Sequence, residues 1–131
     1  MCKFRTFLII PVLLICLMLP GCSKYSSHFM ATAMVHTGFS DSGSLSFYKF
    51  KGTYVLNLKS DKNECIRYKG ELEDGSVKVY YDNDGTKTEL FSVESGEEVD
   101  DKSEPLKKGK TYIIIESDGE VSNGKFEFEI K

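Results

Sequence analysis

The sequence has no tryptophan, only three prolines and only two histidines in 131 residues. The absence of tryptophan argues against a carbohydrate-binding platform, because such platforms present large aromatic rings to the sugar. Two histidines leave few candidates for general acid–base catalysis. Sustained helical periodicity is also missing after residue 22, so the pattern disfavours a helical bundle.

Clusters of basic residues are missing as well. The chain has 17 Lys and Arg residues against 20 Asp and Glu residues, which gives a formal net charge of −3. A protein that binds a phosphate backbone needs a basic face. The composition therefore predicts no nucleic-acid partner.

The N-terminus contains one apolar run, residues 7–19, which follows two basic residues and no acidic residue. A membrane-spanning helix needs about 20 apolar residues, and this run is shorter and contains Pro11. A short basic start before a brief apolar stretch is typical of a secretory signal peptide. We therefore predict a signal helix in residues 1–21.

The run ends in Leu19-Pro20-Gly21-Cys22, which resembles the lipobox of bacterial lipoproteins. The resemblance implies that a diacylglycerol lipid is attached to the Cys22 thiol and that cleavage makes Cys22 the new N-terminus. It also implies an exported protein, anchored at the extracytoplasmic face of a cell membrane or outer membrane. More than one acyl chain gives stable anchoring. Cleavage would leave 110 residues with a formal net charge of −5, divided into a polar tether (22–27) and a single domain (28–131).

Only one thiol remains for the domain. Cys2 and Cys16 lie in the signal peptide and Cys22 is expected to be acylated, so Cys65 has no partner for an intrachain disulfide. The domain must therefore be stabilised by its core. We interpret Cys65 as a structural thiol rather than a nucleophile, because cysteine is among the most frequently buried residue types.

Alternation of apolar and polar residues with a period of two dominates residues 28–131. Phe126, Phe128 and Ile130 alternate with charged residues, and the run 112–115 is continuously apolar, as in a strand covered on both sides. Asp-Gly and Asn-Gly pairs lie between the runs and favour tight hairpins. The pattern predicts an all-β fold, an antiparallel β-sandwich (jelly-roll-like or Ig-like) of about seven or eight strands. Phe128 and residues 112–115 are the expected core.

The segments "LEDGSVKVYYDNDGTKTELF" and "LKKGKTYIIIESDGEVSNGKFEFEI" resemble small extracytoplasmic β-sandwich domains of bacterial lipoproteins and of secreted enzymes, where they are appendages. The shared features are a D-x-D-G hairpin, a buried strand and a last hairpin, within residues 70–131. The resemblance implies a sandwich with a binding or accessory role. The resemblance implies no catalytic residue in this chain.

His28 and His36 are candidate metal ligands, because Met30 and Met34 lie between them at alternate positions and copper binds imidazole and thioether groups. Residues two apart on a strand are separated by about 6.6 Å, however. A regular strand therefore cannot bring both histidines to one ion.

Asp82 and Asp84 have the spacing of the first ligands of a calcium loop, but Val93 stands where an EF-hand needs a bidentate glutamate. A hairpin turn explains the same residues. We therefore predict no metal site and no cofactor apart from the lipid, with weak calcium binding as the alternative.

Two surface features are candidates for binding. Tyr80 should face solvent, because Val79 and Tyr81 are expected to face the core, and an exposed tyrosine can anchor a partner. Residues 96–109 are a candidate loop, and the acidic segment 94–104 is predicted to be open and mobile. Its candidate residues for cationic partners or divalent ions are Glu97, Glu98, Asp100 and Asp101.

We therefore interpret the chain as a lipid-anchored, non-enzymatic β-sandwich with a binding or structural role at the cell envelope. Its expected partners are the membrane, through the lipid, and an envelope protein or glycan. The alternative is a small extracytoplasmic enzyme or metal-handling protein that uses His28 and His36 with acidic residues. That alternative requires both histidines and at least two acids in one concave pocket.

Overall fold

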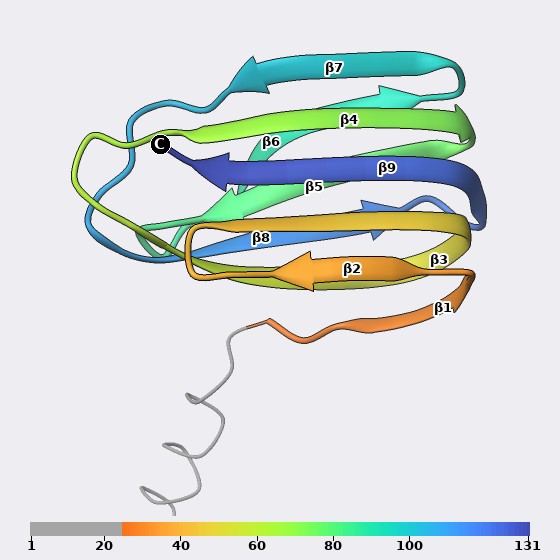
Figure 1. Cartoon of the computed structure of the whole chain (residues 1–131), viewed down its shortest axis with the longest axis horizontal. Helices are drawn as coiled ribbons and strands as arrows, with labels where there is room; N and C mark the ends of the chain where they lie inside the picture. The colour runs from red at the N-terminus through yellow and green to blue at the C-terminus, as the bar shows by residue number, and fades with distance from the viewer. Residues whose placement is uncertain (1–24) are drawn as a thin grey trace, which may run out of the picture.

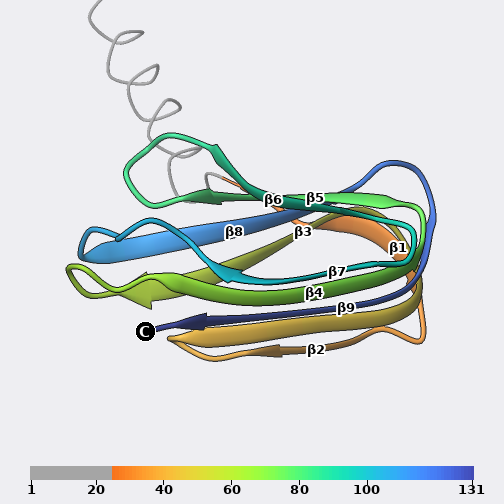
Figure 2. The same ribbon diagram turned by 90° about the horizontal axis from the view of Figure 1, so that it is seen from above.

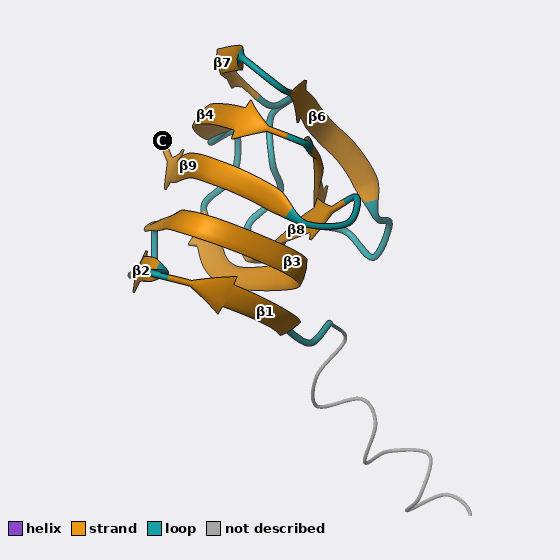
Figure 3. Cartoon of the chain, turned by 90° about the vertical axis from the view of Figure 1, so that its right-hand side faces the viewer, coloured by secondary structure: helices purple, strands orange, loops and turns teal. Residues whose placement is uncertain are grey.

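The computed structural model describes residues 25–131, and within this range it consists of β-strands and connecting turns (Figures 1 and 3). The strands are β1 (His28–Thr32), β2 (Val35–Gly38), β3 (Ser42–Ser60), β4 (Ile66–Asp74), β5 (Ser76–Asp82), β6 (Thr88–Glu94), β7 (Glu97–Lys102), β8 (Gly109–Ser117) and β9 (Val121–Ile130). The predicted all-β sandwich is confirmed. The predicted signal peptide, its lipobox and Cys22 lie outside the described residues.

The strands form one antiparallel sheet that folds back on itself into two layers (Figure 2). The strand order is β6-β5-β8-β3-β9-β4-β7, and β1 and β2 pair with β3. β3 belongs to both layers, because residues 42–50 pair with β9 and residues 53–60 pair with β8. The first layer contains β2, the first half of β3, β9, β4 and β7. The second layer contains β1, the second half of β3, β8, β5 and β6.

The line along which the sheet folds passes through backbone positions with positive φ. Gly52 (φ 127°) bends β3, and Gly75 (φ 112°) separates β4 from β5. At the same end of the molecule the chain also crosses between the layers at Ala33, Gly96 and Gly119, which have positive φ. A Cβ atom at Gly75 would overlap the side chain of Val121, which is fully buried. Glycine is therefore needed at position 75 both for its φ and for close packing.

Gly75→Ala should lower the free energy of unfolding by about 2–4 kcal/mol, because it combines backbone strain with an overlap in the core. Gly96→Ala is the matched control, since Gly96 also has positive φ (78°) but has no atom within 4 Å of the added Cβ. The control should lose only about 1–2 kcal/mol from strain. Urea unfolding of both variants measures the difference. Equal losses in the free energy of unfolding would show that the overlap with Val121 does not contribute to the destabilisation.

The core between the layers is built on stacked aromatic rings. Phe126 is fully buried, and its ring centroid lies 6.2 Å from that of Phe47 and 6.3 Å from that of Phe91. Phe128 is 2% exposed and residues 113–115 are buried, which confirms these predictions. Tyr112, the first residue of the predicted core run, is only half-buried because it faces outward from the second layer.

One predicted loop is largely a strand. β7 pairs with β4 at the sheet edge, so the loop predicted for residues 96–109, and the mobile acidic segment predicted for residues 94–104, are wrong for residues 97–102. Val99 packs against the core while Glu98 and Asp100 face outward. A segment with a single apolar residue gives no recognisable alternation. Its charges are instead typical of an edge strand, where they oppose pairing with another chain.

Candidate functional site

The outer face of the first layer is hollowed. A depression of about 710 Å³ crosses β2, β3, β9, β4 and β7, and an adjoining depression of about 460 Å³ lies over β9, β4 and β7. Both are open to solvent. We call them together the polar hollow, and the polar side chains that line it are Thr37, Ser42, Ser44, Arg67, Lys69, Glu71, Glu98, Asp100, Lys125, Glu127 and Glu129.

Strand register places the central side chains of the hollow in a single row. The row runs across five strands, with each residue opposite the next: Thr37, Ser44, Glu127, Lys69 and Asp100. Opposed residues on one face of antiparallel strands have Cβ atoms about 4.5–5.5 Å apart. The row therefore presents hydroxyl groups at one end and alternating charges at the other. Thr37 Oγ1 and Ser44 Oγ are 2.7 Å apart and share a hydrogen bond.

Two of the three cationic side chains in the hollow are available to a ligand. Arg67 and Lys69 are exposed, and within residues 25–131 neither has a carboxylate oxygen within 4 Å of its charged nitrogens. Lys125, by contrast, lies 3.8 Å from Glu127 Oε1. The hollow can therefore accept a carboxylate at Arg67 and Lys69 without breaking an existing ion pair.

Aromatic rings lie beneath the hollow but are covered. Tyr68 is 8% exposed and Phe128 is 2% exposed, and both belong to the core. Burial raises the pKa of Tyr68, and the negative charge of Asp101 raises it further. Because these rings are not presented to solvent, the hollow is suited to hydrogen bonds and ion pairs rather than to stacking on a sugar ring.

The four acidic candidate residues on β7 lie on two different faces of the strand. Glu98 and Asp100 line the hollow. Glu97 and Asp101 have the opposite parity, and their carboxylates accept hydrogen bonds from the backbone N–H groups of Glu94 and Lys102, both at 2.8 Å. The structure therefore brings two of the four together with the basic residues of β4.

Tyr80 faces outward from the second layer, as predicted, but its ring is covered. It is half-buried, and Lys87 Nζ lies 4.5 Å from its ring centroid. Lys87 also forms an ion pair with Glu116 at 3.1 Å. Because Tyr80 faces outward from the second layer and the polar hollow is on the outer face of the first layer, the two are on opposite sides of the sandwich.

Asp82 and Asp84 lie in the hairpin turn between β5 and β6. Asp82 is 2% exposed, and its carboxylate accepts hydrogen bonds of 2.7 Å from Gly85 N–H and from the Tyr25 hydroxyl. Asp84 accepts a hydrogen bond from Thr86 N–H at 3.2 Å. The expectation of no metal at this turn, with weak calcium binding as its alternative, stays a prediction.

The last residues of the predicted tether lie on the second layer. The ring of Tyr25 contacts the ring of Tyr112 edge-on, with centroids 5.2 Å apart. Burial and the hydrogen bond to Asp82 raise the pKa of Tyr25 to about 12. Ser27 Oγ accepts a hydrogen bond of 2.9 Å from Val55 N–H. The chain is therefore held against the domain from Tyr25 onward.

His28 and His36 are on different strands, on either side of the fold line. His28 is opposite Thr53, and His36 is opposite Leu45 with its ring 5.7 Å from that of Tyr54. Neither histidine lines the polar hollow. In the part of the chain that the structure describes, no three His, Cys, Asp or Glu side chains are grouped as a metal would require.

Cys65 is half-buried and has a free thiol. Its backbone exchanges two hydrogen bonds with Lys131, at 2.8 and 3.0 Å. Among residues 25–131, no helix has the length and hydrophobicity needed to cross a bilayer.

Solved structures resemble this chain in fold. The carbohydrate-binding module TmCBM61, solved with β-1,4-galactotriose, superposes with a TM-score of 0.53 at 13% identity, over 80% of this chain and 87% of the module. The periplasmic g-type lysozyme inhibitor PliG of Aeromonas hydrophila gives a TM-score of 0.46 at 11% identity, over 76% and 88% of the two chains. The pre-peptidase C-terminal domain of a Bacillus anthracis collagenase gives 0.43 at 14% identity, over 72% and 91%. No protein-family model and no curated protein sequence matches the chain.

Proposed function

We propose that the protein is a lipid-anchored, non-catalytic binding module of the cell envelope and that the polar hollow is its ligand-binding surface. The observation that carries this proposal is the row of side chains across five strands. Within residues 25–131, neither Lys69 of the row nor Arg67, which lines the same hollow, has a carboxylate oxygen within 4 Å of its charged nitrogens. The lipobox resemblance at Cys22 supports the anchor and the extracytoplasmic location. The similarity to TmCBM61 supports the fold on which such a surface is built.

The chemistry of the hollow defines its ligand. Arg67 and Lys69 fit carboxylate groups, Glu127 and Asp100 fit ammonium groups, and the hydroxyl groups of Thr37, Ser42 and Ser44 donate and accept hydrogen bonds. An uncharged sugar chain would use only the hydroxyl end of the row. The ligand is therefore a partner with charges of both signs, namely the surface of an envelope protein or a charged wall glycan.

Reversing the two available cations tests this proposal. Full-length protein extracted from a bacterial membrane would be assayed for binding to the isolated envelope fraction of the same cells. The variant Arg67→Glu/Lys69→Glu should bind at least about tenfold more weakly, because the reversed charges repel the partner's carboxylates. Lys59→Glu/Lys78→Glu is the matched control, since it makes the same charge change on exposed residues of the second layer.

The control variant Lys59→Glu/Lys78→Glu should bind the envelope fraction as tightly as the unmodified protein does. Equal loss in both variants would show that net charge, not the hollow, determines binding. No loss in the hollow variant would contradict the proposal.

A further inference from the structure

Opposite sides of the sandwich differ in charge: the sheet ends in β6 and β7 on one side, and β1 and β2 lie along β3 on the other. At one edge, β7 has the sequence EEVDDK, in which five of six residues are charged. At the other edge, the segment from Tyr25 to Ser40, which contains β1 and β2, has no Lys, Arg, Asp or Glu. Exposed edge strands normally have charged residues that prevent pairing with another chain. The uncharged edge lacks this protection.

The uncharged edge also exposes apolar side chains. Five large hydrophobic side chains are exposed in the described part of the chain, and four of them lie between residues 29 and 39. Their exposed fractions are 39% for Phe29, 77% for Met30, 63% for Val35 and 65% for Phe39. Single exposed apolar residues are normal, but a group on one edge indicates a contact surface.

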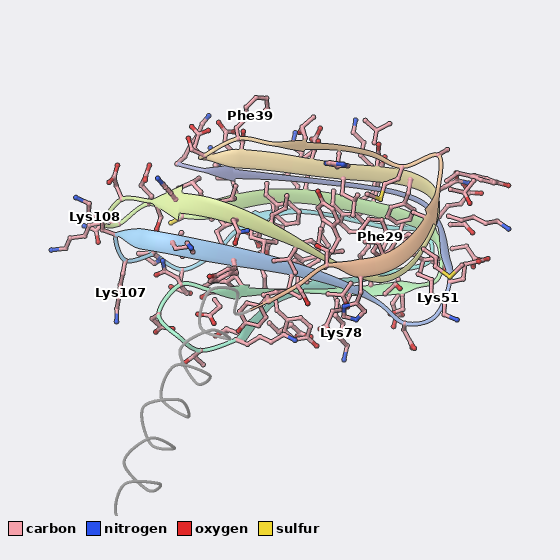
Figure 4. The ribbon with its side chains drawn as sticks, turned by 90° about the horizontal axis from the view of Figure 1, so that it is seen from below. Phe29, Phe39, Lys51, Lys78, Lys107 and Lys108 are labelled. Atoms are coloured by element: carbon pink, nitrogen blue, oxygen red, sulfur yellow. The ribbon has the colours of Figure 1, made fainter. Side chains whose placement is uncertain are left out.

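Lysines surround this edge. Figure 4 looks onto it and shows Phe29 within the view and Phe39 at the upper margin, with Lys51 at one end and Lys107 and Lys108 at the other. Lys78, on β5, does not border this edge, because β8 and β3 lie between them. Apolar side chains bordered by lysines suit the boundary between acyl chains and anionic headgroups, because a lysine side chain is long enough to reach the headgroups while its stem contacts apolar surface.

The chain connects this edge to the predicted lipid. Tyr25 is fixed to Asp82 and Tyr112, and Cys22 precedes it by three residues. An extended chain covers at most about 3.6 Å per residue, so the Cys22 backbone lies within about 11 Å of that of Tyr25. In Figure 1, β1 and β7 are at opposite sides of the molecule. The contacts of Tyr25 lie on β5 and β8, and the chain then passes Ser27, which is hydrogen-bonded to Val55 of β3, before β1 begins at His28. An acyl group on Cys22 would therefore hold the bilayer on the side of the second layer from which β1 starts, away from β7.

We infer that the β1–β2 edge is a membrane-contact surface that rests on a bilayer containing anionic lipids, so that the sandwich stands on this edge with β7 furthest from the bilayer. The inference rests on the proposed lipid anchor, and it adds a second contact that fixes the orientation of the domain. Repulsion between the acidic β7 edge and anionic lipids favours the same orientation. The polar hollow, which extends from β2 to β7, then stays open to partners from the side.

Single tryptophans test the orientation, because the chain has none of its own. Phe39→Trp places the reporter on the β1–β2 edge, and Asp101→Trp places it on β7; both positions are exposed. Full-length protein extracted from bacterial membranes would be incorporated into vesicles of phosphatidylcholine mixed with phosphatidylglycerol, whose anionic headgroups give the bilayer a negative surface potential. Brominated lipids then quench tryptophans that enter the bilayer. Mass spectrometry of the same samples reports whether Cys22 is acylated.

Quenching of the tryptophan at position 39 but not of that at position 101 is the expected result. Adding Met30→Glu to the Phe39→Trp variant should reduce the quenching, and for protein without acyl chains it should weaken partitioning about tenfold or more. Equal quenching at the two positions, or none at either, overturns the inference. A blue shift in the fluorescence emission of the tryptophan at position 39 that occurs without lipid and grows with protein concentration would also overturn the inference. Such a shift would mean that the edge pairs with a second copy of the protein.

The acylation result separates this inference from the proposed function. Protein without acyl chains would contradict the proposed anchor. The edge would still be tested in that case, because unacylated protein would be mixed with the same vesicles at high lipid concentration. Selective quenching at position 39 would then support the edge contact alone, and its absence would overturn it.

Discussion

Phe126→Ala should lower the free energy of unfolding by about 3–5 kcal/mol. Phe126 is fully buried, and its ring stacks between Phe47 and Phe91. Truncation to alanine would leave a cavity bordered by two rigid rings, which cannot relax fully into the space. The loss is a large share of the ~5–15 kcal/mol that stabilises a typical domain. Because residues 25–131 contain only one cysteine and so no disulfide among themselves to limit unfolding, the effect should appear in full.

Urea unfolding followed by far-ultraviolet circular dichroism measures this loss. Tyr48→Ala is the matched control, because Tyr48 is also aromatic and lies on β3 but is 51% exposed. The control should change stability by about 0.5 kcal/mol or less. A loss below about 1 kcal/mol for Phe126→Ala would mean that the two faces of β9 have been assigned the wrong way round.

Cys22→Ala should abolish acylation and processing of the protein. Labelling of growing cells with an alkyne fatty acid should give a strong signal for the unmodified protein and none for the variant. The physical reason is that the thiol is the only group in the lipobox that can be alkylated. Without acyl chains, which contribute about 0.8 kcal/mol per buried methylene, the domain loses its stable anchor.

Cys65→Ala is the control for this experiment, because it removes the other thiol of the mature chain while leaving the lipobox unchanged. It should keep the label and the mass of the processed protein. Continued labelling of Cys22→Ala, with cleavage at the same bond, would contradict the assignment of Cys22 as the lipidated residue.

The sequence predicts the strands whose alternation is strong. Phe126, Phe128 and Ile130 alternate with charged residues, and β9 is found where that pattern lies. β7 could not be predicted, because Val99 is its only apolar residue and its burial depends on pairing with β4. The bend of β3 was not predicted either. Gly52 interrupts an otherwise continuous strand, and its effect depends on which strands pair on either side of it.

The polar hollow could not be predicted from the sequence because its residues are far apart in the chain. Thr37, Lys69, Asp100 and Glu127 come from four strands, and only the register of the folded sheet places them in one row with Ser44. The signals that were present are the alternate serines in residues 42–46 and the alternate charges in residues 125–129. Each of these indicates an outward face, but neither indicates which strand lies beside it.

Site-specific photocrosslinking in intact cells tests most directly whether the polar hollow is the binding surface. A photoreactive phenylalanine analogue at Ser44 lies in the central row of the hollow, and the same analogue at Asn57 lies on the outer face of the second layer. We predict a crosslinked product from position 44 that disappears when Arg67→Glu/Lys69→Glu is added, and no such product from position 57. The same product from both positions, or none from position 44, would contradict the account.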